Sequence, residues 1–152
     1  LQMALVMREA ANGGKKYRPY LVKDIIAPDG TVIKHFDSVV ERDLNIDPSV
    51  ISLVQEGLHE VSTVGTAAAM FKDFPVPIAG KTGTAENSHG REHGWFVAYG
   101  PFDNPNIAVA VIVENAGYGA TSAVPIGYKI LSAAFGLDKP KTPENQPAPA
   151  QQ

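Results

Sequence analysis

The chain contains the stretch Pro77-Ile78-Ala79-Gly80-Lys81-Thr82-Gly83-Thr84-Ala85-Glu86, in which a single lysine stands among glycines and threonines. Glycine destabilises the interior of a helix and proline interrupts it, so this composition argues against a helix. We therefore predict a strand over residues 78–86. This strand is the starting point for the rest of the fold.

The side chains of this strand are expected to alternate between its two faces. Thr82 and Thr84 then share one face, and Lys81 and Gly83 share the other. Two hydroxyls on one face can hold a carboxylate together, while Lys81 adds a positive charge that attracts the carboxylate and can polarise a neighbouring hydroxyl. Gly83 leaves room for another element to approach closely, and a backbone N–H of the strand can serve in an oxyanion hole.

A phosphate-binding loop also contains Gly-Lys-Thr, but it needs a glycine five positions earlier and a helix directly afterwards. Here the earlier position is Pro75, and Thr84-Ala85-Glu86 leads into a loop. Both requirements fail, which argues against nucleotide binding.

Two predicted hairpins flank the stretch. Residues 93–100 and 107–114 are rich in aromatic and β-branched residues and are separated by a turn rich in proline and asparagine, which indicates an antiparallel pair. Residues 20–27 and 31–36 are joined by Pro28-Asp29-Gly30, a composition typical of a tight reversal.

Two helices are predicted before the strand. Residues 1–11 carry apolar residues at helical spacing, and Asn12-Gly13-Gly14 ends the helix. Residues 48–63 follow Asp47, which can cap a helix, and Pro48 suits the first helical turn. The apolar stripe of this second helix comprises Val50, Val54, Leu58, Val61 and Val64.

A further helix is predicted after the glycine-rich loop 116–120, with Thr121 or Ser122 as its cap and Gly136 at its end. The loop is either a mobile element that shapes a cleft or only a flexible link. The residues expected to face one side of this helix are Ile126, Ile130, Leu131, Ala134 and Phe135.

These elements lack a regular alternation of strands and helices, which predicts an α+β fold with an antiparallel sheet packed by helices. Residues 1–137 form the expected folded unit. Residues 138–152 are rich in proline and nearly free of apolar bulk, so we predict that they are disordered.

The composition excludes several classes of partner and chemistry. Lysine and arginine number 13 against 16 aspartates and glutamates, so the formal charge of -3 gives no general attraction for nucleic acid, and no nucleic acid partner is expected. The absence of cysteine excludes disulfides and thiol catalysis. No stretch reaches the roughly 18 apolar residues of a membrane helix, so a membrane anchor is expected outside this chain.

The other polar and aromatic residues favour structural roles. The histidines are His35, His59, His89 and His93. The last two belong to a polar loop, and we expect no metal site. Glu86 and Glu92 are expected to be structural or rim residues rather than an acid/base pair. The aromatic residues expected to pack in the core rather than to stack on a ligand are Trp95, Phe96 and Tyr99.

In order and spacing, several segments of the chain resemble class B penicillin-binding proteins. They are residues 77–86, Gly94-Trp95-Phe96-Val97-Ala98-Tyr99, residues 107–114, Ala10-Ala11-Asn12-Gly13-Gly14 and Tyr17-Arg18-Pro19-Tyr20-Leu21-Val22. The resemblance covers about residues 1–137 and favours the elongation-type group similar to penicillin-binding protein 2. It implies the C-terminal part of the serine β-lactamase and penicillin-binding transpeptidase fold.

The resemblance implies acyl transfer by a serine. In this family the D-Ala-D-Ala end of a peptidoglycan stem peptide acylates the enzyme, and the amine of a neighbouring peptide then attacks the acyl-enzyme. β-Lactams mimic the first substrate. By this resemblance Lys81 and Thr84 are catalytic, with the Thr84 amide as an oxyanion donor, and substrate is bound by Lys81, Thr82, Gly83 and Thr84.

The resemblance also implies partners and a location, and it implies no metal or other cofactor. The expected partners are peptidoglycan stem peptides, β-lactams, the upstream half of the same domain, and membrane proteins of the elongation or division machinery. The implied location is the bacterial cell envelope, at the extracytoplasmic face of the inner membrane.

Two motifs of the family, Ser-x-x-Lys and Ser-x-Asn, are absent. The serines stand at positions 38, 49, 52, 62, 88, 122 and 132, and none begins either motif. We expect the motifs upstream of Leu1 and predict that the chain alone is inactive. The sequence leaves two other hypotheses open: a β-lactam sensor or non-catalytic binding module on the same fold, and a stand-alone interaction domain.

Overall fold

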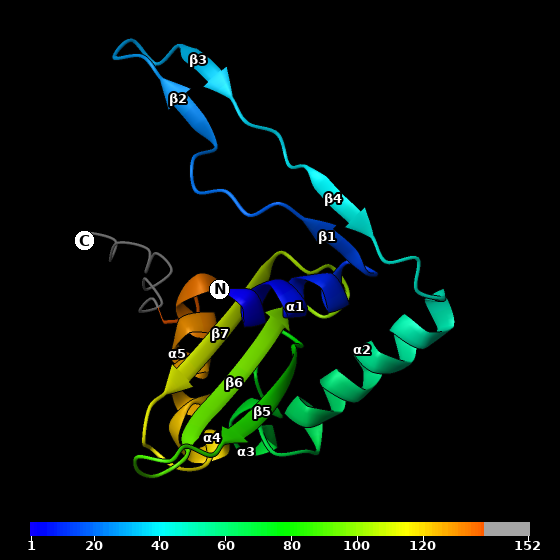
Figure 1. Cartoon of the computed structure of the whole chain (residues 1–152), viewed down its shortest axis with the longest axis vertical. Helices are drawn as coiled ribbons and strands as arrows, with labels where there is room; N and C mark the ends of the chain where they lie inside the picture. Colours follow the sequence, from blue (N-terminus) through cyan, green and yellow to red (C-terminus); the bar gives the residue numbers. More distant parts are fainter. Residues whose placement is uncertain (139–152) are drawn as a thin grey trace, which may run out of the picture.

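The computed structural model describes residues 1–138 and has a three-stranded antiparallel sheet at its centre (Figure 1). In the order of the sheet, the strands are β5 (Ala79–Ala85), β6 (His93–Gly100) and β7 (Ile107–Val113). β6 pairs with both neighbours, which confirms the strand and the hairpin predicted for this region. Apart from Asp138, the tail predicted to be disordered lies outside the described residues.

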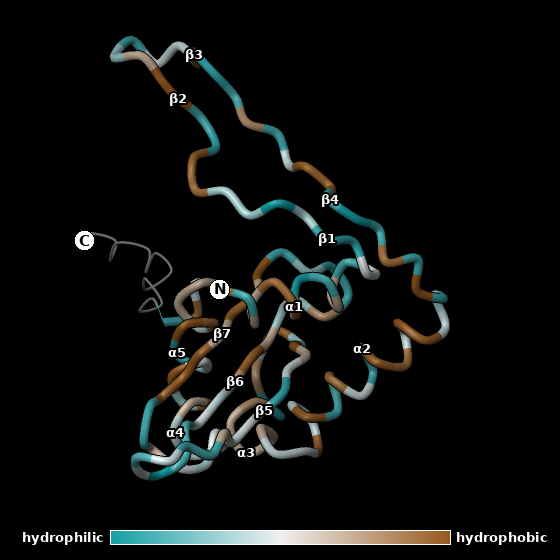
Figure 2. Tube along the Cα trace, in the orientation of Figure 1, coloured by the Kyte–Doolittle hydropathy of each residue, from teal (hydrophilic) through white to brown (hydrophobic). Residues whose placement is uncertain are grey.

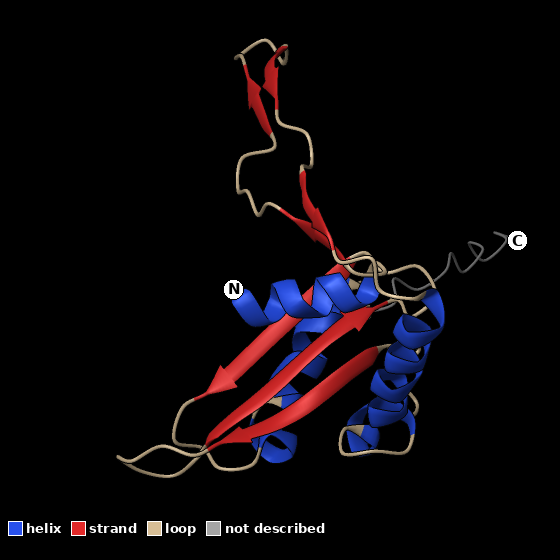
Figure 3. Cartoon of the chain, turned by 45° about the vertical axis from the view of Figure 1, so that its right-hand side comes forward, coloured by secondary structure: helices blue, strands red, loops and turns tan. Residues whose placement is uncertain are grey.

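Helices cover both faces of this sheet (Figure 3). α1 (Gln2–Ala11) lies across one face, and α5 (Val124–Ala134) packs on the opposite face. The short helices α3 (Ala68–Phe71) and α4 (Gly119–Ser122) contact α5, and α2 (Pro48–Thr63) runs beside β5. The sheet is thus a middle layer between helices, as predicted for an α+β fold.

Alternating residues of β6 supply the cores on the two faces. Phe96 is 0% exposed and stacks on Phe71, with 5.6 Å between the ring centroids, on the side of α5. Tyr99 is 1% exposed and packs with Met7 of α1 on the other side. The predicted packing roles of Phe96 and Tyr99 are confirmed, whereas Trp95 is only half-buried.

α2 has the predicted bounds and cap. Asp47 Oδ1 accepts a hydrogen bond of 2.8 Å from the Ser49 N–H. Leu58 and Val61 pack against the cores, but Val50 is 52% exposed. The N-terminal turns of α2 lie away from the sheet, so only part of the apolar stripe is covered within the described residues (Figure 1).

The cap predicted for the last helix is wrong. Thr121 and Ser122 lie inside or at the end of α4, and both hydroxyls donate to the carbonyl oxygen of Tyr118. α5 begins after Ala123, which makes no side-chain cap. The chain bends between α4 and α5, and the hydroxyls that were expected to cap α5 instead bond to Tyr118, directly before α4.

The buried side of α5 also differs from the prediction. Ile126 and Ile130 are exposed, whereas Leu131 is fully buried as expected. Gly127 faces the sheet, because a Cβ at that position would overlap the ring of Phe96. The ring of Phe96 therefore fills the space beside Gly127, and with this side of α5 on the sheet the two isoleucines face outward. Gly136, with φ +70°, follows the end of the helix as predicted.

A long ribbon projects from the body between α1 and α2 (Figure 1). Its outer part is the predicted hairpin, with β2 (Asp24–Ile26) and β3 (Val32–His35) shorter than expected. Its inner part pairs β1 (Lys15–Tyr17) with β4 (Val40–Asp43), which the sequence did not predict. Apolar residues recur along the ribbon (Figure 2), and Leu21 is fully exposed.

Candidate functional site

The predicted substrate strand is β5, an edge strand of the sheet within the described residues. Lys81 is paired with Val97 and Thr82 with Phe96, so these two side chains lie on opposite faces. Lys81 lies on the side of α1, and Thr82 and Thr84 lie on the side of α4. The side chains of this strand therefore alternate between its two faces as predicted.

Lys81 is exposed, and its ammonium donates a hydrogen bond of 2.6 Å to the carbonyl oxygen of Thr82. Within residues 1–138 this ammonium forms no ion pair. The side chain borders a cavity of about 320 Å³ that Met3 and Trp95 also line. The positive charge is thus available beside a cavity rather than neutralised by a carboxylate.

The two threonines face a second cavity, of about 390 Å³. Thr84 is exposed there, whereas Thr82 is only 9% exposed. The Oγ1 atoms of Thr82 and Thr66 lie 2.6 Å apart. The residues that line the cavity are Thr66, Lys81, Thr82, Gly83, Thr84, Tyr118, Gly119 and Ala120.

The carbonyl oxygen of Gly83 lies close to α4, whereas a Cβ on Gly83 itself would meet only the side chain of Trp95. A Cβ built on Gly119 of α4 would overlap the carbonyl oxygens of Gly83 and Trp95. Glycine at position 119 therefore lets the start of α4 rest on β5 and β6. This contact forms one wall of the cavity that Thr82 and Thr84 face.

The sequence did not predict one residue of this cavity and left the role of another open. Thr66 lies in the turn between α2 and α3, where nothing in the local sequence marks it as a partner of β5. Tyr118 belongs to the loop 116–120, whose role was open, and it is 71% exposed at the cavity. Both were placed here by the packing of helices rather than by a motif.

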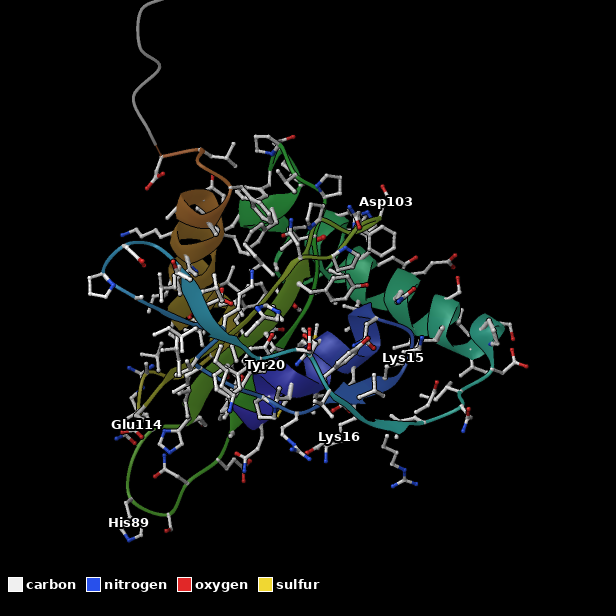
Figure 4. The ribbon with its side chains drawn as sticks, turned by 90° about the horizontal axis from the view of Figure 1, so that it is seen from above. Lys15, Lys16, Tyr20, His89, Asp103 and Glu114 are labelled. Atoms are coloured by element: carbon white, nitrogen blue, oxygen red, sulfur yellow. The ribbon has the colours of Figure 1, made fainter. Side chains whose placement is uncertain are left out.

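Ser88 and His89 do not take part in the site at β5. Ser88 Oγ and His89 Nδ1 lie 2.8 Å apart, but both are exposed in the loop between β5 and β6, and His89 extends from the body at the end of this loop (Figure 4). Among residues 1–138, histidine and carboxylate side chains form no group of three or more that could hold a metal ion. Within the same residues, no helix is both long and apolar enough to cross a membrane.

The order of strands, the covering helices and the Lys-Thr-Gly-Thr edge strand agree with a known family. The model of the penicillin binding protein transpeptidase domain matches residues 1–132. The chain belongs to the penicillin-binding protein transpeptidase family. This confirms the family expected from the sequence.

Among relatives of this chain, the peptidoglycan D,D-transpeptidase MrdA of Haemophilus influenzae is 33% identical over 172 residues, covering 100% of this chain and 26% of that protein. Penicillin-binding protein 2B of Streptococcus pneumoniae matches in structure with a TM-score of 0.78 and 28% identity, over 95% of this chain and 25% of the other. Penicillin-binding protein A of M. tuberculosis, solved as an imipenem acyl-enzyme complex, matches with a TM-score of 0.71 and 35% identity, over 87% of this chain and 29% of the other.

The chain thus spans about a quarter of the length of the curated relative. The relatives support the class B, penicillin-binding protein 2-like group and the fold of penicillin-binding transpeptidases. The predictions of group and fold class are confirmed.

Proposed function

We propose that this chain supplies the substrate-clamping wall of a peptidoglycan D,D-transpeptidase. The observation that carries this proposal is the edge strand β5, which offers an exposed ammonium from Lys81 and hydroxyls from Thr82 and Thr84 beside a cavity of about 390 Å³. A carboxylate in this cavity can accept hydrogen bonds from both hydroxyls. The terminal carboxylate of a D-Ala-D-Ala stem peptide, or that of a β-lactam, has the required chemistry.

In the proposed reaction a serine oxygen attacks the carbonyl carbon of the D-Ala-D-Ala peptide bond. The C–N bond breaks, the released D-alanine takes a proton, and an ester joins the serine to the remaining peptide. The amine of a second stem peptide then attacks this ester and releases the serine. In a β-lactam the broken C–N bond belongs to the ring, so the leaving group stays attached.

Within this reaction the residues of β5 have separate roles. Thr82 and Thr84 hold the carboxylate, and Lys81 adds positive charge beside the serine of the middle motif. The N–H of Thr84 is a donor to the oxyanion that forms during attack. Gly119 lets α4 rest on the Gly83 carbonyl, which keeps the cavity wall in place.

The nucleophile is proposed to lie outside this chain, because no serine of the sequence begins a Ser-x-x-Lys or Ser-x-Asn motif. The whole protein would then act in the bacterial cell envelope, at the extracytoplasmic face of the inner membrane. Its partners would be stem peptides and the membrane proteins of the elongation or division machinery.

Covalent labelling with fluorescent penicillin tests this function. The full-length protein that contains this chain is expected to be labelled, and the chain alone is expected to remain unlabelled. A label on the isolated chain would contradict the placement of the nucleophile. Stable acylation of the full-length protein without transfer to an acceptor amine would favour the sensor instead of the enzyme.

A further inference from the structure

A pair of hydroxyls connects the turn after α2 to the proposed substrate clamp. Thr66 Oγ1 and Thr82 Oγ1 are 2.6 Å apart, so one hydroxyl donates a hydrogen bond to the other. We propose that Thr66 is a positioning residue. Its hydroxyl donates a hydrogen bond to Thr82 Oγ1, and the hydroxyl of Thr82 then points its own hydrogen toward the substrate carboxylate. This inference rests on the proposed function.

The direction of the hydrogen bond follows from the chemistry of the substrate. A carboxylate only accepts hydrogen bonds, so a hydroxyl that binds it must donate. Thr82 has one hydroxyl proton, and it can give this proton to a carboxylate only while it accepts from Thr66. Because hydrogen bonds in a chain polarise one another, donation by Thr66 also strengthens the bond from Thr82 to the carboxylate.

The backbone on both sides of Thr66 is fixed. The Gly65 N–H donates to the carbonyl oxygen of Glu60 at 2.8 Å, and the Ala67 N–H donates to that of Val61 at 2.9 Å. A Cβ at Gly65 would lie 2.8 Å from Val61 Cα, so a larger residue there would move the turn. Ala67 is 1% exposed and anchors the turn in the core. The backbone at Thr66 is thus held in place by Gly65 and Ala67, and the side chain of Thr66 is not needed for this and can bond to Thr82.

The turn is also tied to the strand that carries Thr82. Ser62, near the end of α2, is 2% exposed, and its Oγ lies 2.8 Å from the carbonyl oxygen of Ile78, directly before β5. A second hydrogen bond thus joins α2 to the start of β5, close to the pair of threonine hydroxyls. A contact held in this way is suited to set the direction of a hydroxyl proton, which would otherwise rotate freely.

The test compares the acylation of the full-length protein by benzylpenicillin and by its methyl ester. The ratio of the two second-order rate constants reports recognition of the carboxylate, because a loss of folded protein or of serine reactivity lowers both rates together. Thr82→Val is expected to lower the ratio. Thr66→Val is expected to lower it by about five- to tenfold, the effect of one lost hydrogen bond, and Thr66→Ser is expected to retain it.

Thr63→Val is the matched control, since among residues 1–138 the exposed hydroxyl of Thr63 hydrogen-bonds only to helix carbonyl oxygens, those of His59 and Glu60. It should leave the ratio unchanged. If Thr82→Val lowers the ratio while Thr66→Val and a second variant, Thr66→Ala, do not, the inference is overturned and the proposed function stands. If neither Thr82→Val nor Lys81→Ala affects the ratio, the proposed function itself fails.

Discussion

The imidazole of His59 donates a hydrogen bond of 2.6 Å from Nδ1 to the carbonyl oxygen of Ile78, immediately before β5. A carbonyl oxygen can only accept, so this contact fixes the proton on Nδ1. Ser62 Oγ lies 2.8 Å from the same oxygen and 2.7 Å from the His59 carbonyl, so its single hydroxyl proton is shared between these two acceptors. Two side chains of α2 therefore serve one buried acceptor at the start of the substrate strand.

We predict that these two donors compensate for each other. His59→Phe keeps a ring to stack on Phe102, now 4.4 Å away between centroids, and Ser62→Ala removes the hydroxyl. Each change should cost about 1 kcal/mol of unfolding free energy. The double variant should cost about 1 kcal/mol more than the sum, because the Ile78 carbonyl then loses both donors.

Urea unfolding of the single and double variants measures this coupling. His59→Phe combined with Ser132→Ala is the control, since Ser132 lies on α5 and, among the described residues, its hydroxyl makes no hydrogen bond to the Ile78 carbonyl. That pair should be additive. Additivity of His59→Phe with Ser62→Ala would show that the shared acceptor is unimportant.

Two glycine substitutions are predicted to have opposite effects. In Gly119→Ala the new methyl would overlap the carbonyl oxygens of Gly83 and Trp95, which are backbone atoms of β5 and β6. This overpacking should lower the unfolding free energy by about 2 kcal/mol or more and displace α4 from the clamp. Gly57→Ala meets nothing within 4 Å on α2, so it should stabilise by roughly 0.5–1 kcal/mol.

Thermal unfolding of the two variants measures the opposite changes in stability. A general effect of replacing glycine by alanine would change both in the same direction. In the full-length protein, acylation by fluorescent penicillin should be impaired by Gly119→Ala and unaffected by Gly57→Ala. A Gly119→Ala protein as stable as the wild type would mean that α4 does not rest closely on β5.

The central strands and α2 could be predicted because their signals are local. β6 and β7 are runs rich in aromatic and β-branched residues on either side of a turn with proline and asparagine, and Asp47 before Pro48 marks the start of α2. Lys81 and its neighbours could be singled out because a strand fixes which residues share a face. These features depend on residues close together in sequence.

The inner ribbon and the hydroxyl pair could not be predicted, because both depend on distant partners. β1 and β4 are short and polar, and the ion pair of 3.4 Å between Lys16 and Glu41 joins two strands that are far apart in the sequence. Thr66 is one hydroxyl in a turn, and it reaches Thr82 only through the packing of α2 beside β5. Neither case leaves a periodic apolar pattern in the sequence.

Stability at alkaline pH is predicted to depend on Tyr99. Burial raises the pKa of this phenol to about 12, and its hydroxyl has no hydrogen-bond partner among the described residues. The folded state holds the phenolic proton more tightly than the unfolded state, whose pKa is about 10. The stabilising contribution is therefore complete below pH about 10 and is lost as the pH rises toward about 12.

Tyr99→Phe should remove this part of the pH dependence, because phenylalanine does not ionise. At pH 7 the variant should be at least as stable as the wild type, since it also removes a buried hydroxyl without a partner. Urea unfolding at several pH values between 7 and 12 measures both effects. An unchanged alkaline slope in Tyr99→Phe would assign the pH dependence to other groups.

The charge of Lys81 is predicted to matter for acylation and not for folding. Lys81→Ala in the full-length protein should slow acylation by penicillin about 10- to 100-fold, the effect of losing a charged hydrogen-bond donor. The unfolding free energy should change by no more than about 0.5 kcal/mol, because the side chain is exposed and makes no ion pair within residues 1–138. Lys81→Met, which keeps the aliphatic stem, should show the same loss of rate, whereas Lys129→Ala on the exposed side of α5 should acylate normally. Near-normal acylation by both Lys81 variants would reject the role of this ammonium and leave the two threonines as the only clamp.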